Sequence, residues 1–239
     1  YFPPDGFASL RLVIKIGEKW PQKVAFYILE PANSYRMYIN GQLAASSGQP
    51  GMDQASTLHS LRPRTAEFIR GEQEELEIVL HIANYIDREG GRKRPIYLGT
   101  PNTIKKMRNR RIVSEGLIGG ALLIIGLYNL VLFLVRRSER LPLAFSAVCF
   151  VFGIYALFSG ERLILLFFDI PFELFGKLWF FQYYIMVPAV AWFIHCLFPE
   201  DGRLPVYKGL AIFSAILAGL TFALPFSRGV DIFSVKSAM

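Results

Sequence analysis

The stretch KKMRNRRIVSEGLIGGALLIIGLYNLVLFLV, residues 105–135, sets the fold class of this 239-residue chain. Its last 24 residues, 112–135, are almost entirely apolar, and a helix of that length crosses the roughly 30 Å hydrocarbon core of a bilayer. The seven residues before them, 105–111, carry five positive charges and no acid, which is typical of a segment at a membrane surface. The stretch therefore predicts a basic juxtamembrane joint followed by a membrane span.

Further apolar runs follow, so that residues 112–239 are predicted to form a membrane region with four spans. We expect these spans at about 112–135, 141–160, 178–198 and 209–226. The segment 161–177 is apolar but is interrupted by acids and a proline, which favours an interfacial helix in a loop; a longer second span is the alternative. Small residues at Gly116 and Gly120 are interpreted as a helix-packing stripe, as are Ala211, Ala215, Gly219 and Ala223. We expect them to pack within the bundle, with a homodimer seam as the alternative.

The net charge of +7 is localised. The joint, Lys105, Lys106, Arg108, Arg110 and Arg111, supplies +5, whereas residues 1–104 and 112–239 are each close to neutral. A single basic cluster beside an apolar span favours membrane lipids as a partner and argues against nucleic acid.

The first 104 residues differ from the rest because they alternate polar and apolar side chains. In FASLRLVIKI, residues 7–16, Ala8, Leu10, Leu12, Ile14 and Ile16 share one parity, which predicts a strand with these residues facing a core. In YRMYINGQLAASSGQPG, residues 35–51, Asn40-Gly41 predicts a two-residue hairpin turn. Short strands with Gly- and Pro-rich connections predict a jelly-roll or similar β-sandwich at 1–104.

Four stretches carry a family resemblance. The hairpin at 35–51 and LHIANYIDREGGRKRPIYLG, residues 80–99, resemble the extracellular jelly-roll domain, with its galactose-binding-like fold, of bacterial seven-transmembrane receptors with diverse intracellular signalling modules. GLYNLVLFLVRRSER, residues 126–140, together with SGERLILLFF, residues 159–168, resembles the start of their membrane region. The resemblance implies a multi-pass protein of the bacterial inner membrane with its β domain in the periplasm. It also implies a cytoplasmic output module, such as a cyclase, histidine kinase or phosphatase, in the full-length protein, of which we expect this chain to be a fragment.

Charge alone leaves the orientation open. If the β domain is outside, RRSER at 136–140 lies inside, as the positive-inside rule prefers, but the more strongly basic joint then lies outside. The resemblance favours the β domain outside.

Ligand candidates come from the β domain, because sandwich domains bind sugars by stacking on aromatic rings and hydrogen bonding through Asn and Arg. The candidates are Trp20, Arg36, Tyr38, Asn84 and Arg88. Arg36, Tyr38 and Asn40 share one strand parity, so they are expected on one polar surface. Core packing, turn capping or solvation is the competing explanation for each candidate.

The remaining chemistry-bearing residues predict no catalytic function for this chain. His59, His81 and His195 lack the spacing of metal ligands, Cys149 and Cys196 read as small buried hydrophobes, and no nucleophile or phosphate-binding motif is present, so we expect no metal and no cofactor. Glu115, Asn129, Gln182 and His195 lie at membrane depth or near its edge and are expected to form interhelical hydrogen bonds. A ligand-sensing receptor is the leading function; a transporter or channel with an accessory domain and a membrane-anchored carbohydrate-binding protein are the alternatives.

Overall fold

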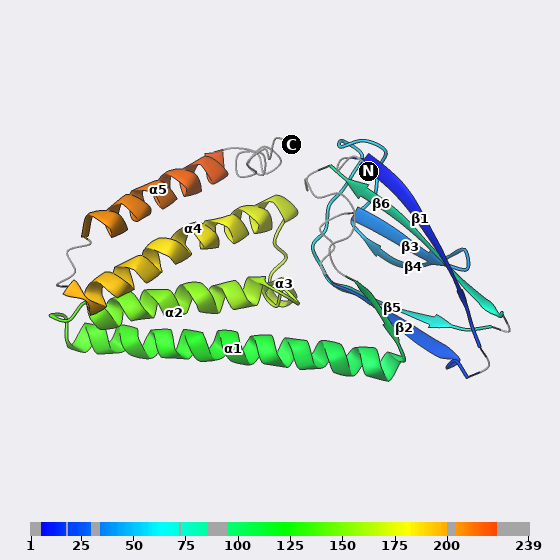
Figure 1. The fold of residues 1–239 in the computed structure, drawn as a ribbon, viewed down its shortest axis with the longest axis horizontal. Helices are drawn as coiled ribbons and strands as arrows, with labels where there is room; N and C mark the ends of the chain where they lie inside the picture. The colour runs from blue at the N-terminus through cyan, green and yellow to red at the C-terminus, as the bar shows by residue number, and fades with distance from the viewer. Residues whose placement is uncertain are drawn as a thin grey trace. The chain divides into compact units, whose positions relative to one another are not determined.

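The computed structural model describes residues 6–17, 19–29, 34–71, 73–85, 95–199 and 204–223. The chain divides into two compact units, Tyr1–Arg111 and Ile112–Met239. The first unit is built from strands and the second from helices (Figure 1). The sequence prediction of an N-terminal β region followed by membrane helices is therefore confirmed at this level.

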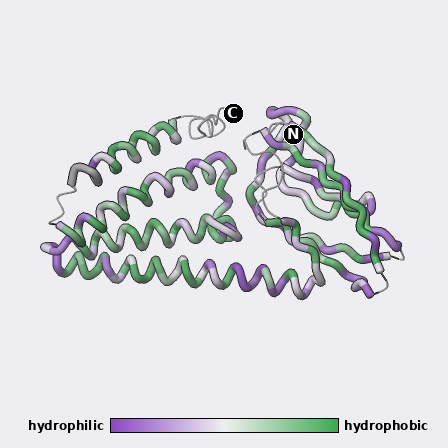
Figure 2. The backbone as a smooth tube through the Cα atoms, viewed as in Figure 1, coloured by the Kyte–Doolittle hydropathy of each residue, from purple (hydrophilic) through white to green (hydrophobic). Residues whose placement is uncertain are grey.

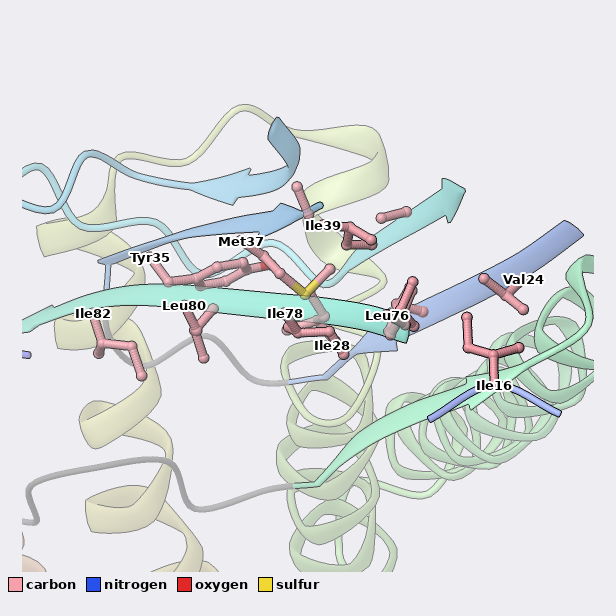
Figure 3. Close-up of a cluster of buried hydrophobic side chains, with 13 residues drawn as sticks. Ile16, Val24, Ile28, Tyr35, Met37, Ile39, Leu76, Ile78, Leu80 and Ile82 are labelled. Atoms are coloured by element: carbon pink, nitrogen blue, oxygen red, sulfur yellow. The ribbon is translucent and has the colours of Figure 1, made fainter. Parts of the chain in front are cut away.

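In the described part of the first unit, the strands form two antiparallel sheets. The strands are β1 (Gly6–Lys15), β2 (Lys23–Ile28), β3 (Ser34–Ile39), β4 (Gln42–Ser47), β5 (Arg64–Ile69), β6 (Glu75–Asn84) and β7 (Ile96–Gly99). One sheet has the order β1-β6-β3-β4 and the other the order β5-β2-β7. Their inner faces share a single core, to which β2 contributes Val24, Phe26 and Ile28, and β6 contributes every second residue from Leu76 to Ile82 (Figure 3).

The predicted face of the first strand lies on the core side of the sheet, but for most of its length its side chains are not buried. Leu10 is 51% exposed and Leu12 is 57% exposed, and only Ile16 is buried in the core. The register Leu10↔Leu80 and Leu12↔Ile78 does place them on the core side of the sheet. However, β1 is an edge strand of the four-stranded sheet, and the described part of the other sheet has three strands, so most β1 side chains lie beyond the shared core.

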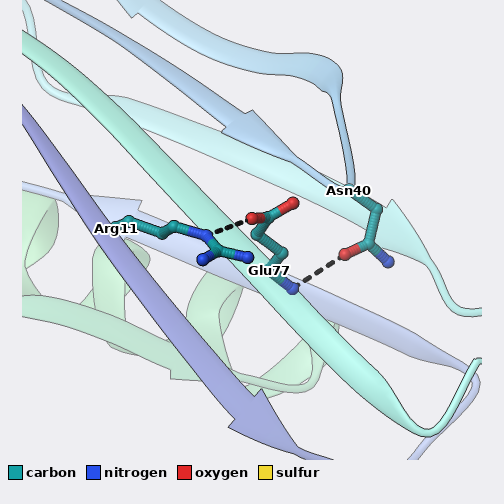
Figure 4. Close-up of polar contacts among 3 residues, drawn as sticks. All are labelled: Arg11, Asn40 and Glu77. Carbon is teal, nitrogen blue, oxygen red and sulfur yellow. Dashed lines mark hydrogen bonds and ion pairs between the residues drawn. The ribbon is translucent and has the colours of Figure 1, made fainter.

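The predicted hairpin turn is confirmed. Asn40 and Gly41 have φ of 48° and 78°, the left-handed pair that a type I′ turn requires, and Ile39 pairs directly with Gln42. The Asn40 side chain also holds the neighbouring strand, because its Oδ1 accepts a hydrogen bond from the Glu77 backbone N–H at 2.8 Å (Figure 4). The Glu77 carboxylate in turn pairs with Arg11 of β1. Asn40 therefore has a structural role in the turn.

Among the described residues, three helices are long and apolar enough to cross a membrane: α2 and α4 of the second unit, and α1, which begins in the first unit and continues into the second. The helices are α1 (Pro101–Val135), α2 (Leu141–Phe158), α3 (Ile164–Phe167), α4 (Phe172–Leu197) and α5 (Leu204–Ala223). The apolar part of α5, Tyr207–Ala223, is shorter. Within this unit α4 packs against both α2 and α5.

Helix α1 begins at Pro101, well before the apolar stretch, so the basic joint forms its first turns and is itself helical (Figure 2). Two local signals explain this start. The Thr100 hydroxyl accepts a hydrogen bond from the Thr103 N–H at 3.3 Å, as an N-cap does, and Pro101 takes the first helical position. Lys and Arg are good helix formers, so the charged run continues the helix without a break.

The packing between α1 and α2 uses different glycines from those predicted. A Cβ on Gly119 would lie 3.4 Å from the Gly153 carbonyl oxygen, and one on Gly126 would lie 3.3 Å from the Cys149 Cβ. In contrast, a Cβ on Gly120 would meet nothing within 4 Å. The Ser146 hydroxyl donates to the Gly126 carbonyl oxygen at 2.8 Å across the same seam. On α5 the predicted stripe does not pack against the other described helices, because Ala215, Gly219 and Ala223 are exposed, whereas Ser214 and Thr221 are buried. The four-residue spacing was right for a helix, but it does not determine which way the helix is rotated.

Candidate functional site

A row of three aromatic rings crosses the outer face of the four-stranded sheet. The His81 ring, on β6, stacks on Phe7 of β1 with ring centroids 5.9 Å apart. Its other neighbour is Tyr38 of β3, which meets it edge-on at 5.4 Å. All three rings lie on the face opposite the core, because their strand parity is opposite to that of Leu80 and Met37.

Polar side chains accompany this row. The Ser9 hydroxyl lies 2.7 Å from Nδ1 of the His81 imidazole. Arg36 is the direct cross-strand neighbour of His81, and within the described residues its guanidinium forms no hydrogen bond or ion pair. Aromatic faces beside hydroxyl, imidazole and guanidinium groups suit a ligand that offers both CH faces and hydroxyl groups. We call Phe7, Ser9, Arg36, Tyr38 and His81 the outer-sheet patch.

Of the four predicted ligand residues that the structure describes, it brings together Arg36 and Tyr38. Trp20 lies in the turn after β1, where its side chain packs against the core from the opposite end of the sheet. Asn84 is buried at the last position of β6, opposite Gly6, and has the core-side parity of Ile82. Arg88 lies outside the described residues. Strand alternation therefore placed Arg36 and Tyr38 correctly on one face, but it could not predict which residues of other strands lie beside them.

Phe7, Ser9 and His81 are members of the patch that were not predicted from the sequence. His81 has no metal-ligand spacing, so the sequence offers no motif that marks it. Its parity, opposite to Leu80 and Ile82, could have placed it on the outer face. Its proximity to Tyr38 and Phe7 depends on β6 lying between β3 and β1, and strand order is not readable from local alternation.

The joint connects the β domain to α1 through the outer face of the other sheet. Strand β2 is buried on both faces: Ala25, Tyr27 and Leu29 point away from the core and pack with Ile104 of α1. The guanidinium of Arg111 lies 5.8 Å from the ring centroid of Tyr27 and 5.4 Å from that of Tyr97. Its Nη2 also donates to the Tyr97 hydroxyl at 3.4 Å. Arg111 is thus a contact to the sheet, in addition to being a charge.

The other members of the joint are arranged differently. Arg108 is half-buried, and Lys105, Lys106 and Arg110 are exposed. The sequence predicts the five residues as a single cluster, but in the structure they lie on two faces of the helix.

In the helical unit, a carboxylate of α1 holds the turn that follows α2. Oε2 of Glu115 accepts a hydrogen bond from the Glu161 backbone N–H at 2.8 Å. Gly160 has φ of +56°, and a Cβ there would lie 2.0 Å from Glu115 Oε1, so the close approach requires glycine. Arg162 also has φ of +56°, and its buried guanidinium lies over the rings of Phe175 and Trp179 of α4, at 5.7 Å and 5.6 Å from their centroids. We call Glu115, Gly160, Glu161 and Arg162 the turn cluster.

The remaining polar residues of the helices are less directly involved. Asn129 donates to the Ile125 carbonyl oxygen of its own helix at 2.9 Å, and among the described residues it does not form the predicted interhelical bond. His195 stacks on Tyr207 of α5 with centroids 5.2 Å apart, and Gln182 is buried in α4. In the part of the chain that the structure describes, no cluster of three or more His, Cys, Asp or Glu residues could hold a metal ion.

A β domain joined to several apolar helices defines a multi-pass membrane protein. Residues 111–237 match the family described as 7TM diverse intracellular signalling, and the chain belongs to that family. This confirms the resemblance of the membrane region. The match does not extend to the β domain, and neither the curated proteins nor the solved structures contain a match to the chain.

Proposed function

We propose that this chain is the sensing and membrane-spanning part of a bacterial signalling receptor. Its β domain, of the jelly-roll, galactose-binding-like type, lies in the periplasm and binds a ligand. The helices of the inner membrane pass the resulting change to a cytoplasmic output module of the same full-length protein, which holds the enzymatic activity. Family membership supports a role in membrane signalling.

The observation that carries the proposal is the continuity of α1. The helix is packed onto β2 at Ile104 and Arg111 and continues without interruption to Val135. A helix is stiff over this length. A ligand-induced movement of the sheet would therefore move the helix as well, whereas a flexible linker would absorb the movement. A transporter needs no such mechanical connection to an external domain, and a simple anchor needs only one span.

The outer-sheet patch is the proposed ligand surface, and carbohydrate is the proposed class of ligand. Tyr38 and Phe7 provide ring faces on which a sugar stacks, while Arg36, Ser9 and His81 provide hydrogen-bonding groups for its hydroxyls. For such a ligand to signal, it must bind two arrangements of the protein with different affinity.

Topology is the first test. Alkaline phosphatase and green fluorescent protein are fused after Gly99 and, separately, after Ser138. We expect the Gly99 fusion to be active as the phosphatase and the Ser138 fusion to fluoresce. The reverse pattern would place the β domain in the cytoplasm and would refute periplasmic sensing.

Ligand binding is the second test. The chain, reconstituted in nanodiscs, is applied to a glycan array and compared with Tyr38→Ala and His81→Ala. Ile69→Ala is the matched control, because Ile69 is an exposed apolar residue of the other sheet. We expect the affinity for a bound glycan to fall about tenfold or more in the patch variants. Stacking of a sugar on one ring contributes about 1.4 kcal/mol, within the range of aromatic pairs, and this energy corresponds to a factor of about ten. Equal retention by all variants would exclude the outer-sheet patch as the glycan site.

A further inference from the structure

The joint contains two adjacent arginines with different surroundings. Arg111 packs on Tyr27 and Tyr97, whereas Arg110 is exposed. We infer that Lys106 and Arg110 form a binding surface for anionic phospholipid headgroups, bordered by Lys105, and that Arg111 is excluded from it. This inference rests on α1 being a membrane helix, and it holds for either orientation of the β domain.

Helix geometry separates the two groups of residues. Ile104, Met107 and Arg111 follow one another at intervals of three and four and form the side of α1 that packs on β2 and Tyr97. At about 100° of rotation per residue, Lys106 and Arg110 lie only about 40° apart, while Arg111 lies about 140° from Lys106. Lys106 and Arg110 therefore share a face that the β domain leaves exposed.

The same face continues along α1 as an exposed apolar row. Continuing from Lys106 and Arg110 at intervals of three, four and seven leads to Val113, Leu117 and Ile124, which are 57%, 68% and 70% exposed. Large apolar side chains exposed on a membrane-spanning helix are stable in contact with lipid tails. The two cations therefore extend a lipid-facing row, which selects lipid over an acidic protein as the partner.

The axial positions also match a headgroup layer. With a rise of 1.5 Å per residue, Arg110 lies about 3 Å and Lys106 about 9 Å before the first apolar residue, Ile112. The polar layer on each side of a bilayer is roughly 5–8 Å thick, and long Lys and Arg side chains reach along it. Lys106 and Arg110 are thus placed to contact phosphate groups of one leaflet.

Nothing in the described chain neutralises these two charges. Residues 100–114 contain no acid, and neither Lys106 nor Arg110 forms an ion pair or hydrogen bond with its side chain among the described residues. The nearest acid along α1, Glu115, is bound to the turn at Glu161. Anionic lipid is therefore the counterion that the surface requires.

The test compares adjacent arginines. The chain is reconstituted in phosphatidylcholine vesicles that contain a trace of photoactivatable phosphatidylglycerol or, in parallel, photoactivatable phosphatidylcholine. Crosslinks are mapped by mass spectrometry, and the ratio of phosphatidylglycerol to phosphatidylcholine yield is measured for residues 101–125. The ratio at residues 136–145, near the other end of α1, is the internal reference.

We expect Arg110→Gln to lower this ratio about fivefold, from the roughly 1 kcal/mol that each basic residue contributes near an anionic surface. Arg110→Lys should keep most of the preference, and Arg111→Gln should leave the ratio unchanged. An equal fall of the ratio in Arg110→Gln and Arg111→Gln would show that only the total charge of the joint matters, and it would overturn the inference. An unchanged ratio in Arg110→Gln would overturn it as well, and would direct the search to acidic proteins.

Discussion

Glu115 and Glu161 are joined by a hydrogen bond of 2.8 Å from the Glu161 backbone N–H to the Glu115 carboxylate. The bond connects α1 to the turn after α2, and the next residue, Arg162, lies over Phe175 and Trp179 of α4. Three segments of the helical unit thus meet at the turn cluster. A displacement of α1 along its axis changes this junction directly, so the cluster is a point where α1 is coupled to α4.

The first prediction concerns Gly160. We expect Gly160→Ala to destabilise the helical unit by at least about 1 kcal/mol, because a non-glycine residue at positive φ costs roughly 1–2 kcal/mol and its Cβ would collide with Glu115 Oε1. Thermal unfolding of the chain in detergent, followed by Trp179 and Trp192 fluorescence, measures the change. The double variant Glu115→Ala with Gly160→Ala should recover the part due to the collision. Full stability of Gly160→Ala alone would contradict the close approach.

The second prediction uses two neighbouring glycines of α1. Gly119→Leu should destabilise the helices by about 1–3 kcal/mol, since its side chain would enter the space occupied by Leu157 and the Gly153 carbonyl. Gly120→Leu adds the same side chain one residue later, where nothing lies within 4 Å, and should be neutral or slightly stabilising. The same detergent unfolding measurement applies. If Gly120→Leu destabilised the protein more than Gly119→Leu, the packing of α1 on α2 through Gly119 would be incorrect.

Local chemistry made parts of this fold predictable. Asn40-Gly41 specifies its turn because few residues adopt positive φ, and the membrane helices follow from the length of their apolar runs. The start of α1 was not predicted, because the charged residues of the joint favour a helix as much as the apolar ones do.

The parts that could not be predicted depend on non-local arrangement. Alternation placed Leu10 and Leu12 on the correct side of β1. It could not show that β1 is an edge strand whose side chains extend past the facing sheet and stay exposed. Arg36 and Tyr38 were recognised as one surface from a single strand, whereas His81 joins them only through the order of the strands. The division of the joint required knowing that Arg111 packs against two tyrosines from other parts of the chain.

The third prediction separates two roles of Asn40. Asn40→Gly keeps the left-handed backbone and loses the side-chain hydrogen bonds to the Glu77 N–H and to Gln73, so the β domain should lose about 1 kcal/mol. Asn40→Ala loses the same bonds and leaves at positive φ a residue that adopts this conformation less readily than Asn does, for a total of about 2 kcal/mol. Hydrogen exchange of residues 34–47 and 75–84 in the intact chain reports the difference. Equal protection in the two variants would mean that the backbone conformation contributes nothing at this turn.

The fourth prediction concerns pH. Burial lowers the pKa of His59 below its ordinary value of 6.5, so the folded β domain takes up this proton less readily than the unfolded chain does. The stability associated with His59 is therefore fully present above about pH 6.5 and is lost as the pH falls towards the lowered folded-state pKa. The neighbouring residue Leu58 pairs with Gln49, and its carbonyl oxygen accepts the Ser34 hydroxyl at 2.6 Å, so β3 should be affected.

We expect protection against hydrogen exchange in residues 34–60, normalised to the intrinsic exchange rate at each pH, to fall between pH 7.5 and pH 5. His59→Gln, which cannot take up the proton, should show a smaller fall over the same range. Parallel pH dependences in the wild-type chain and His59→Gln would assign the effect to other groups. A rise in protection on acidification, specific to the wild-type chain, would require the opposite shift of the His59 pKa.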